Sequence, residues 1–304
     1  MAPDDVVTPP SRPAGGDAAA RADDMTRERR RAGNTTEDAT ATVTARLAGA
    51  AKYRDVHPDT IADVVAGQRD GTTDPAELER RSRARLHKVA ALHLLTGRLA
   101  ALRRGMDKAD LAGMAEPELR AWCREVLAAH VSTGERLPDL DRFYPAVLDL
   151  VPPPATIADL ACALNPFTLP WLREHTDAGY TGYDLNAGFV GLAEDFLTRV
   201  YPGSHAEQRD VLVGSSLPDV DLALLLKTYH CIEDRRRGAA LSLVDQVPAA
   251  AVVVSFPTRA MNGRAAVFAR RHVADLTELA DRRGWRLDRA TLDTEDLLVI
   301  TKRH

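Results

Sequence analysis

The chain has 304 residues, of which 45% are hydrophobic and 28% are charged, and its formal net charge at pH 7 is -4. This composition is ordinary for a water-soluble protein and leaves room for two modest domains. It excludes a membrane-spanning protein, because no window approaches the roughly 18 consecutive apolar residues of a span, and the N-terminus lacks a signal-peptide pattern. We therefore expect a cytoplasmic protein that does not contact membranes. Three widely spaced cysteines, Cys123, Cys162 and Cys231, favour free thiols and no metal site.

The first third of the chain divides into a leader and a helical region. Residues 1–34 are rich in Pro, Gly, Ala, Asp and Arg without apolar periodicity, which predicts a disordered leader. Over 35–137 nearly every segment has helical spacing, with breaks expected at Gly71, Gly105 and Pro117. We expect an all-helical domain over this range.

Basic residues concentrate between Arg80 and Arg104, where no acid occurs. A basic run on a helix is more often a solvated face than a binding site. A second acid-free patch, FPTRAMNGRAAVFARRH (256–272), follows an acidic stretch. Two such patches favour contact with the phosphates of a nucleic acid. The candidates in the first patch are Arg81, Arg85 and Lys88.

After Leu137 and Pro138 the pattern changes, and short β-type runs alternate with helical ones. This alternation predicts a mostly parallel sheet covered on both faces, and the last two consecutive runs predict an antiparallel edge. About seven strands ending that way resemble the α/β, Rossmann-like fold of class I S-adenosylmethionine methyltransferases, which we assign to 138–304. The expected strands are TIADL (156–160), TGYD (181–184), RDVLV (209–213), DLALLLK (221–227), AAVVVSF (250–256), WRLDRATL (285–292) and DLLVITK (296–302).

The stretch DLACALNP (159–166) follows the first of these strands. A turn beneath a nucleotide-type cofactor requires very small side chains at alternate positions, and Ala161 and Ala163 meet this requirement without glycine. Asn165 would cap the next helix and Pro166 fits its first position, so free N–H groups would point at the cofactor carboxylate. A structural turn without a ligand is an equally good interpretation of this loop alone.

Acidic residues also follow the next two expected strands. Asp184 ends GYTGYD, where this kind of sheet places the acid that accepts hydrogen bonds from the ribose hydroxyls; the alternative is a helix N-cap. Asp210 and Val211 stand at the third strand, where the adenine amino group and ring face would lie. Acids at three successive strands, beginning with Asp159, favour a cofactor site.

Five segments carry a family resemblance. They resemble the 16S rRNA methyltransferases that modify N7 of guanine 1405 and confer aminoglycoside resistance, the Arm, Rmt and Kgm family of actinomycete producers and resistant pathogens. The resemblance runs from about residue 35 to the end. The segments are HVSTGERLP (130–138), DLACALNPF (159–167), GYDLN (182–186), LLLKTYHCIED (224–234) and SFPTRAMNGR (255–264).

The resemblance implies S-adenosylmethionine as cofactor, 16S rRNA in the assembled 30S subunit as partner, and resistance to gentamicin and kanamycin; we expect a monomer. It implies that Arg136 holds the methionyl carboxylate, which suits a guanidinium fork. The other implied cofactor contacts are His130, Val131, Ser132, Ala161, Asp184, Asp210, Val211, Leu226 and Arg235. The positions implied near the target base are Lys227 and Glu233, with Arg259 and Arg264 in a basic loop over the reaction site.

The sequence departs from the family pattern in several places. Gly134 stands for an arginine, Ala163 for a glycine and Arg235 for the usual glutamine, while Ala260 and Met261 replace a Ser-Leu pair. These departures concern the rim of the cofactor site and the target loop.

Guanine N7 has an in-plane lone pair and no proton to lose, so we expect no catalytic general base. A covalent route through Cys231 is a minor alternative, because a lone cysteine after a strand is usually packing. The base would have to leave the RNA helix and stack on a planar group. Tyr229, Phe256 and Trp171 are candidates, each equally explicable as core.

Three other functions stay open. A related enzyme could methylate N1 of a nearby adenine in 16S rRNA. A small-molecule methyltransferase would carry an apolar lid, which the basic helical region does not resemble. A ribosome-binding protein with a degenerate pocket would explain the glycine-free loop, although Arg136, Asp184 and Asp210 speak against it.

Overall fold

A computed structural model of the chain describes residues 37–70, 72, 74–89, 98–214, 216–258 and 265–302, the last range without the side chains of 265–269. The expected leader lies outside these residues. Within them, every helix is too short or too polar to span a lipid bilayer.

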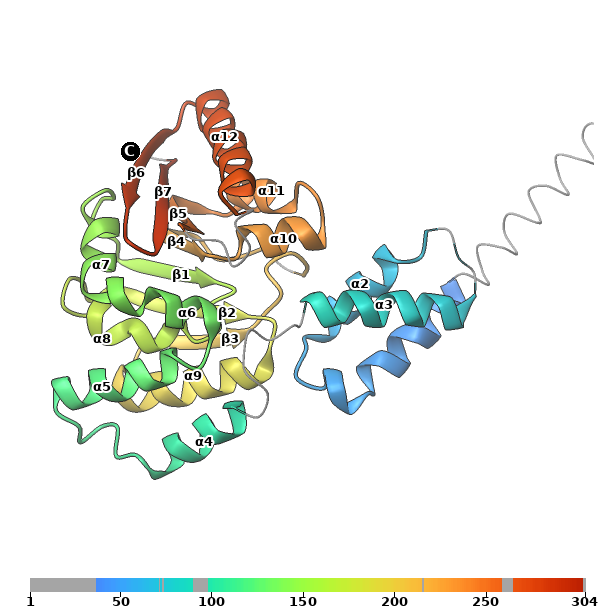
Figure 1. Ribbon diagram of the computed structural model, residues 1–304, viewed down its shortest axis with the longest axis horizontal. Helices are drawn as coiled ribbons and strands as arrows, with labels where there is room; N and C mark the ends of the chain where they lie inside the picture. Colours follow the sequence, from blue (N-terminus) through green and yellow to red (C-terminus); the bar gives the residue numbers. More distant parts are fainter. Residues whose placement is uncertain are drawn as a thin grey trace, which may run out of the picture.

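The N-terminal helices form a unit with a small core of its own, which we call the helical unit (37–89). It contains a helix over 37–48, the 3-10 turn η1 (Ala51–Tyr53), α2 (Pro58–Gly67) and α3 (Pro75–Val89). Their apolar faces meet in one cluster, to which Leu185 of the larger body adds a side chain. Figure 1 shows this unit beside the larger body, which contains the sheet. Its core contains Val43, Leu47, Tyr53, Val56, Ile61, Val64, Val65, Leu78 and Leu86.

The larger body is built on one sheet of seven strands. The strands are β1 (Thr156–Leu160), β2 (Gly179–Asp184), β3 (His205–Gln208), β4 (Val220–Leu226), β5 (Ala249–Pro257), β6 (Arg286–Thr291) and β7 (Glu295–Thr301). Their spatial order is β3-β2-β1-β4-β5-β7-β6. Strands β1 to β5 are parallel to one another, and β7 is antiparallel to both β5 and β6. The expected mostly parallel sheet with an antiparallel edge is confirmed.

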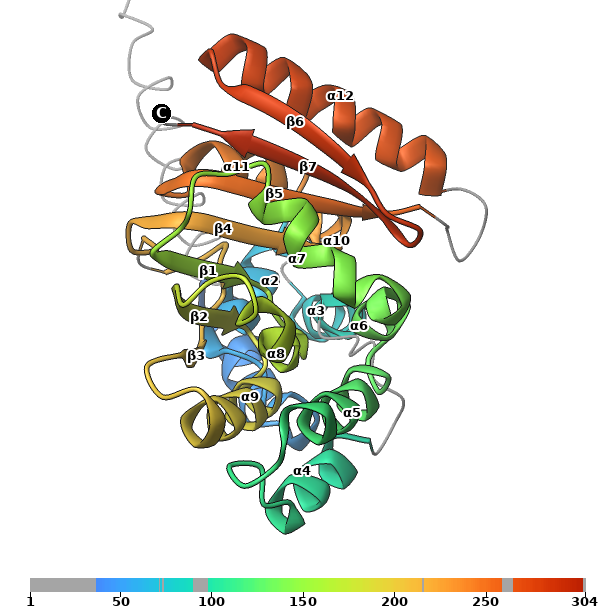
Figure 2. The ribbon, with the colours of Figure 1, turned by 90° about the vertical axis from the view of Figure 1, so that its left-hand side faces the viewer.

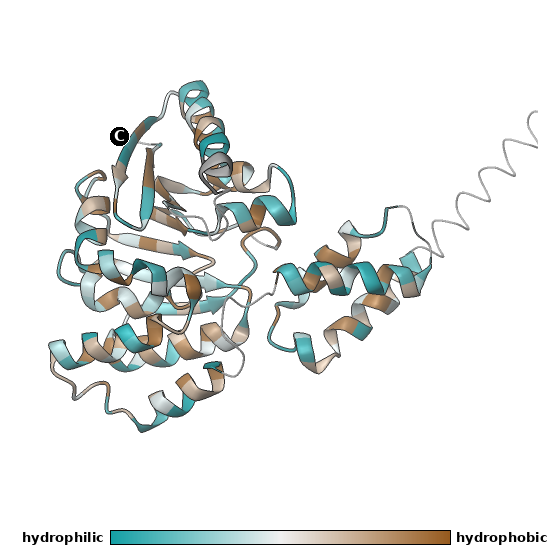
Figure 3. Ribbon diagram, viewed as in Figure 1, coloured by the Kyte–Doolittle hydropathy of each residue, from teal (hydrophilic) through white to brown (hydrophobic). Residues whose placement is uncertain are grey.

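Helices cover both faces of the sheet because the central strands are apolar on both sides. Along β4, Leu222, Leu224 and Leu226 face one hydrophobic cluster, whereas Ala223 and Leu225 face the other. Figure 3 accordingly shows brown segments on strands in the middle of the sheet, while α12 and the helical unit alternate between teal and brown.

Two sets of helices build these layers, as the turned view in Figure 2 shows. The first cluster is completed by α4 (Arg98–Lys108), α5 (Glu116–Leu127), η2 (Leu137–Asp139), α7 (Leu140–Leu148), η3 (Asn165–Thr168), α8 (Leu169–Leu172) and α9 (Ala187–Val200). Helix α6 (Val131–Arg136) lies between α5 and η2 in the chain. The second face carries α10 (Tyr229–Arg235), α11 (Ala239–Gln246) and α12 (Ala265–Arg283).

Two expectations about single elements were wrong. The third strand is His205–Gln208, not RDVLV, because a polar segment suffices for an edge strand, whereas Val211 and Leu212 pack after it against the second cluster. Gly105 does not break a helix but lies inside α4, where a glycine costs only about 1 kcal/mol relative to alanine.

The division at residue 137 into a helical and a methyltransferase domain stays a prediction. In the packing, the apolar side chains from Met106 to Val151 share the first cluster with the sheet, whereas those of the helical unit form a cluster apart.

Candidate functional site

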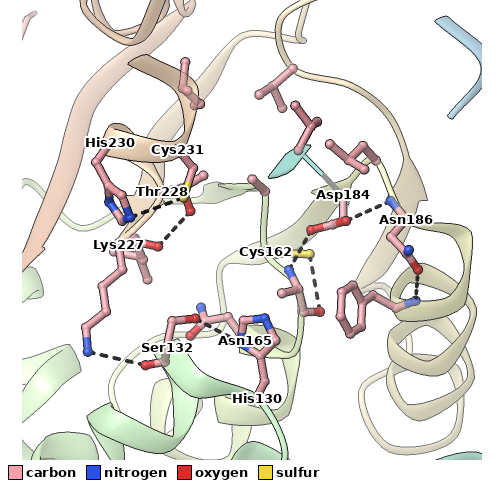
Figure 4. A pocket seen from close by; sticks show the side chains of 18 of the residues that line it. His130, Ser132, Cys162, Asn165, Asp184, Asn186, Lys227, Thr228, His230 and Cys231 are labelled. Carbon is pink, nitrogen blue, oxygen red and sulfur yellow. Dashed lines mark hydrogen bonds between the residues drawn. The ribbon is translucent and has the colours of Figure 1, made fainter. Parts of the chain in front are cut away.

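A cavity of about 470 Å³ opens at the carboxyl ends of β1, β2 and β4. Strand β1 lies between β2 and β4, so the chain reverses its winding direction there, which is where doubly wound sheets bind ligands. Its volume is in the range of small-molecule and cofactor sites. Figure 4 shows this pocket, with His130 and Ser132 on one side and Asp184 and Asn186 on another. The predicted residues that line it are His130, Val131, Ser132, Arg136, Ala161, Asp184, Asp210, Val211, Leu226, Lys227 and Arg235.

The loop after β1 adopts a glycine-like backbone with alanines. Ala161 has φ 58° and Ala163 has φ 46°, in the left-handed region that costs an L-residue roughly 1–2 kcal/mol. Between them, the Cys162 N–H donates to the Tyr183 carbonyl at 2.9 Å, and its sulfur packs against β2, where a Cβ on Gly182 would lie 2.9 Å from it. The loop is thus held against β2 despite its strained backbone.

Asp184 closes β2 and faces the cavity from a buried position. Its two oxygens accept hydrogen bonds from the N–H groups of Ala163 (3.0 Å) and Asn186 (2.8 Å). Burial raises the pKa of this carboxyl to about 6, against the opposing effect of these two bonds. The N-cap alternative for Asp184 was wrong, because the side chain of Asn186 caps α9.

Arg136 is buried and already paired. Its Nε and Nη2 donate to the two oxygens of Glu295 at 2.5 and 3.0 Å, and its Nη1 donates to Asn165 Oδ1 at 2.7 Å. Burial alone would lower the pKa of Arg136, but attraction to Glu295 outweighs it and the pKa is raised. Burial likewise opposes the ionisation of Glu295, yet Arg136 holds the pKa of that carboxyl below its usual value.

No local pattern pointed to Glu295, because it lies 159 positions from Arg136, at the start of β7. The expected cap at Asn165 was wrong. Its side chain donates to Asp159 at 2.6 Å instead of capping, and the segments that follow are a 3-10 turn and a helix of four residues. The polar groups beneath the loop after β1 therefore form a network with Asp159. Burial raises the pKa of Asp159, although the hydrogen bonds from Tyr180 and Asn165 oppose this shift.

Lys227 directly follows β4, and its side chain is directed into the cavity. Its backbone has φ 55°, and its Nζ lies 3.1 Å from Glu135 Oε2 and 3.4 Å from the Ser132 carbonyl. A strained residue at a pocket is typical of a functional position. Glu135, which sequence reasoning did not single out, therefore holds the Lys227 ammonium from α6.

Glu233 is not brought to the cavity. Its carboxylate accepts hydrogen bonds from the N–H groups of Gly238 and Ala240, both at 2.8 Å, and so caps α11. Arg259 and Arg264 lie outside the described residues.

The basic run of α3 separates into two groups. Arg85 and Lys88 line the mouth of the cavity. Arg81, by contrast, pairs with Glu77 at 2.7 Å, and its neighbours Arg80 and Arg83 also pair with acids a turn earlier. The run looked free of acids because its partners precede it on the helix.

None of the proposed stacking residues lines the cavity. Trp171, Tyr229 and Phe256 are all buried, with exposed fractions of 1%, 1% and 3%, which agrees with the core interpretation. Cys231 does line it, but burial and the charge of Asp234 raise its thiol pKa to about 11. A thiol that stays protonated at neutral pH is a poor nucleophile.

The sheet order, the small-residue turn after β1 and the acid that closes β2 together define a class I S-adenosylmethionine-dependent methyltransferase. A model of the FmrO ribosomal RNA methyltransferase family matches residues 49–300, and the chain belongs to this family.

Single relatives agree with the family. The chain is 33% identical over 258 residues to the 16S rRNA (guanine(1405)-N(7))-methyltransferase of Micromonospora echinospora, covering 83% of this chain and 92% of the relative. Among solved structures, the 16S rRNA methyltransferase RmtF in complex with S-adenosyl-L-homocysteine is 27% identical with a TM-score of 0.66, covering 86% of this chain and 98% of RmtF. The 16S rRNA methylase RmtB, at 23% identity, shares the fold with a TM-score of 0.70, over 87% of this chain and 98% of its own.

Proposed function

We propose that the protein transfers a methyl group from S-adenosylmethionine to N7 of guanine 1405 in the 16S rRNA of the assembled 30S subunit. It acts as a cytoplasmic monomer, and the product is a ribosome resistant to gentamicin and kanamycin. The observation that carries the proposal is the pocket, which gathers residues from α6, β1, β2, the β3–β4 loop, β4 and α10 around one cavity. These residues are far apart in the sequence, and chance would not place them together.

The donor set suits the cofactor. Asp184 offers acceptors for two vicinal hydroxyls, and the apolar side chains of Val211 and Leu226 suit the faces of a purine ring. Ala161 lets the backbone approach closely. A guanidinium has five N–H donors, and Arg136 uses three of them on Glu295 and Asn165, so the other two can meet a carboxylate. Each of these cofactor contacts is part of the proposal. S-Adenosylmethionine, when bound, supplies an electrophilic methyl group on a sulfonium.

The protein's own residues then need only place the target base. Guanine presents N7 and O6 as neighbouring acceptors, and N7 must stay free to attack. We propose that Lys227 positions the target guanine, because Glu135 and the Ser132 carbonyl hold its ammonium inside the cavity. No proton leaves N7, so neither His130 nor His230 has to act as a base. Placement and exclusion of water account for the rate.

The direct test is mass mapping of 16S rRNA after purified 30S subunits are incubated with the protein and S-adenosylmethionine. A methyl group at N7 of guanine 1405, with no modification of naked 16S rRNA, supports the proposal and its 30S context. A methyl group at N1 of a neighbouring adenine would replace it with the adenine alternative, and an unmodified rRNA would reject both.

A further inference from the structure

The helical unit (37–89) docks on the two loops that form one end of the cavity. The N–H of His57 donates to the Leu185 carbonyl at 2.8 Å, and the N–H of Ala187 donates to the Asp55 carbonyl at 2.7 Å. The side chain of Gln208 bonds to both carbonyls, at 3.1 and 3.3 Å. These contacts join the unit to the residues that directly follow β2 and to the last residue of β3.

A buried polar cluster extends this junction to Asp210. Thr60 of α2 donates its hydroxyl to Asp210 Oδ2 at 2.6 Å. Arg235 of α10 lies between two carboxylates, with Nη1 2.6 Å from Asp210 and Nη2 2.7 Å from Asp63 of α2. Arg236 pairs with the other oxygen of Asp63. We call Thr60, Asp63, Asp210 and Arg235 the α2 junction.

The side chains of the α2 junction are much more buried than those of surface ion pairs. The side chains of Arg235, Asp210 and Asp63 are 6%, 1% and 17% exposed, and the Nε of Arg235 is buried without a partner. Burying such groups costs desolvation energy that pairing only roughly offsets. The α2 junction therefore contributes little net stability. What it provides is a fixed position for Asp210, which it holds from two sides.

We infer that Thr60 and Asp63 are positioning residues for the cofactor site, acting from the helical unit through Arg235 and Asp210. The inference rests on the proposed function, in which Asp184 holds the ribose of S-adenosylmethionine, and on the expectation from the sequence that Asp210 lies at the adenine amino group. Docking of the helical unit and filling of that half of the pocket are then linked, so each strengthens the other. Arg235 itself lines the cavity, and in this inference it acts by holding Asp210.

The test is calorimetric titration of the full chain with S-adenosylhomocysteine. Asp63→Asn and Thr60→Val should each weaken binding about five- to thirtyfold, within the usual range of coupling between sites, although neither side chain lines the cavity. Asp59→Asn is the matched control, because it removes one acid from an exposed position of the same helix. Its affinity should equal that of the parent.

A second readout separates positioning from mere stability. In the parent, S-adenosylhomocysteine should slow amide hydrogen exchange in α2, and Asp63→Asn should abolish this slowing while the far-UV spectrum stays native. The double variant Asp63→Asn, Arg235→Gln should lose less affinity than the sum of the single losses, because both act on one cluster. Thr60→Val changes no charge and so covers the case in which Asp63→Asn folds poorly.

Two negative outcomes are distinguishable. A parent that does not bind S-adenosylhomocysteine overturns the proposed function together with this inference. A parent that binds it, with Asp63→Asn and Thr60→Val binding equally well, overturns the inference alone.

Discussion

The ion pair of Arg136 and Glu295 has side-chain exposures of only 2% and 0%, and this burial decides what a substitution can reveal. Removing one partner leaves a buried charge unpaired, at a cost of about 3–5 kcal/mol. We expect Arg136→Ala to lower the free energy of unfolding by about that amount in urea denaturation, beyond any loss of cofactor affinity.

A double variant is the control for this prediction. Replacing both Arg136 and Glu295 by leucine removes the pair without leaving a charge, so most of the lost unfolding free energy should return. Binding of S-adenosylhomocysteine should still be lost. A double variant as unstable as Arg136→Ala would contradict the explanation by an unpaired charge.

Asp184 makes the cofactor affinity depend on pH. Burial, with repulsion from Asp159 and Asp210, raises its pKa to about 6. If the ionised carboxylate accepts the ribose hydroxyls, the proton must leave before binding. Affinity for S-adenosylhomocysteine should therefore be constant above pH 7 and fall by up to about tenfold per unit below pH 6, measured by calorimetry.

The control is Asp184→Asn, which should bind weakly and without this pH dependence. A profile that persists in Asp184→Asn would contradict the assignment of this titration to Asp184. The raised pKa of Asp184 has the opposite effect on the stability of the unliganded protein, which it increases at low pH. The folded carboxyl binds its proton more tightly than the unfolded one, so this group favours the fold more at pH 4 than at pH 7.

At the scale of single elements, the loop after β1 has a left-handed backbone conformation at two alanines, a residue type that disfavours this conformation. Ala163 at φ 46° should be replaceable by glycine, because the relief of left-handed strain offsets the greater freedom of glycine in the unfolded chain. Ala163→Gly should be about 0–1 kcal/mol more stable in thermal unfolding, with unchanged cofactor binding. Ala163→Val should be less stable and bind poorly, and equal behaviour of the two variants would contradict the strain argument.

Helix α3 offers a comparison within one basic run. Reversing Arg85 and Lys88 to glutamate should weaken binding to the 30S subunit and reduce the slope of affinity against salt, because phosphate contacts release counterions. Arg81→Glu should have a smaller effect, since Arg81 pairs with Glu77. Filter binding at several salt concentrations tests this, and equal losses would assign the whole run to RNA contact.

The same variants also bear on cofactor binding. Since Arg85 and Lys88 line the cavity, their reversal is expected to alter cofactor affinity as well, whereas Arg81→Glu should not.

At the scale of the whole molecule, the position of the methyl group predicts a phenotype. A methyl at N7 turns an acceptor into a cationic, blocked edge, so gentamicin and kanamycin would meet a lost hydrogen bond and a clash. Expression in a susceptible bacterium should give high resistance to gentamicin and none to apramycin, measured as inhibitory concentrations. Apramycin resistance would favour the adenine reaction, and susceptibility to gentamicin despite soluble expression would contradict the guanine assignment.

Much of the fold could be predicted from the sequence, because the signals are local. The apolar runs of β4 and β5 and the two consecutive final strands predict the sheet, since burial on both faces requires such runs. The exception is β3, whose sequence HAEQ has no strand pattern, because an edge strand does not need one. The residue types of the cofactor loop, Asp159, Asp184 and Arg136, were also visible in the sequence with the family resemblance beside it.

The sequence by itself determined the class of fold, the residue types of the loop after β1 and many of the polar residues that line the cavity. Only the tertiary structure decided which partners these residues have. Glu295 pairs with Arg136, Glu135 with Lys227, and Asp63 with Arg235 across 172 positions. Such pairs depend on how the strands and helices are ordered in space, and a charged residue at the end of a strand or on a helix looks in the sequence like any solvated side chain.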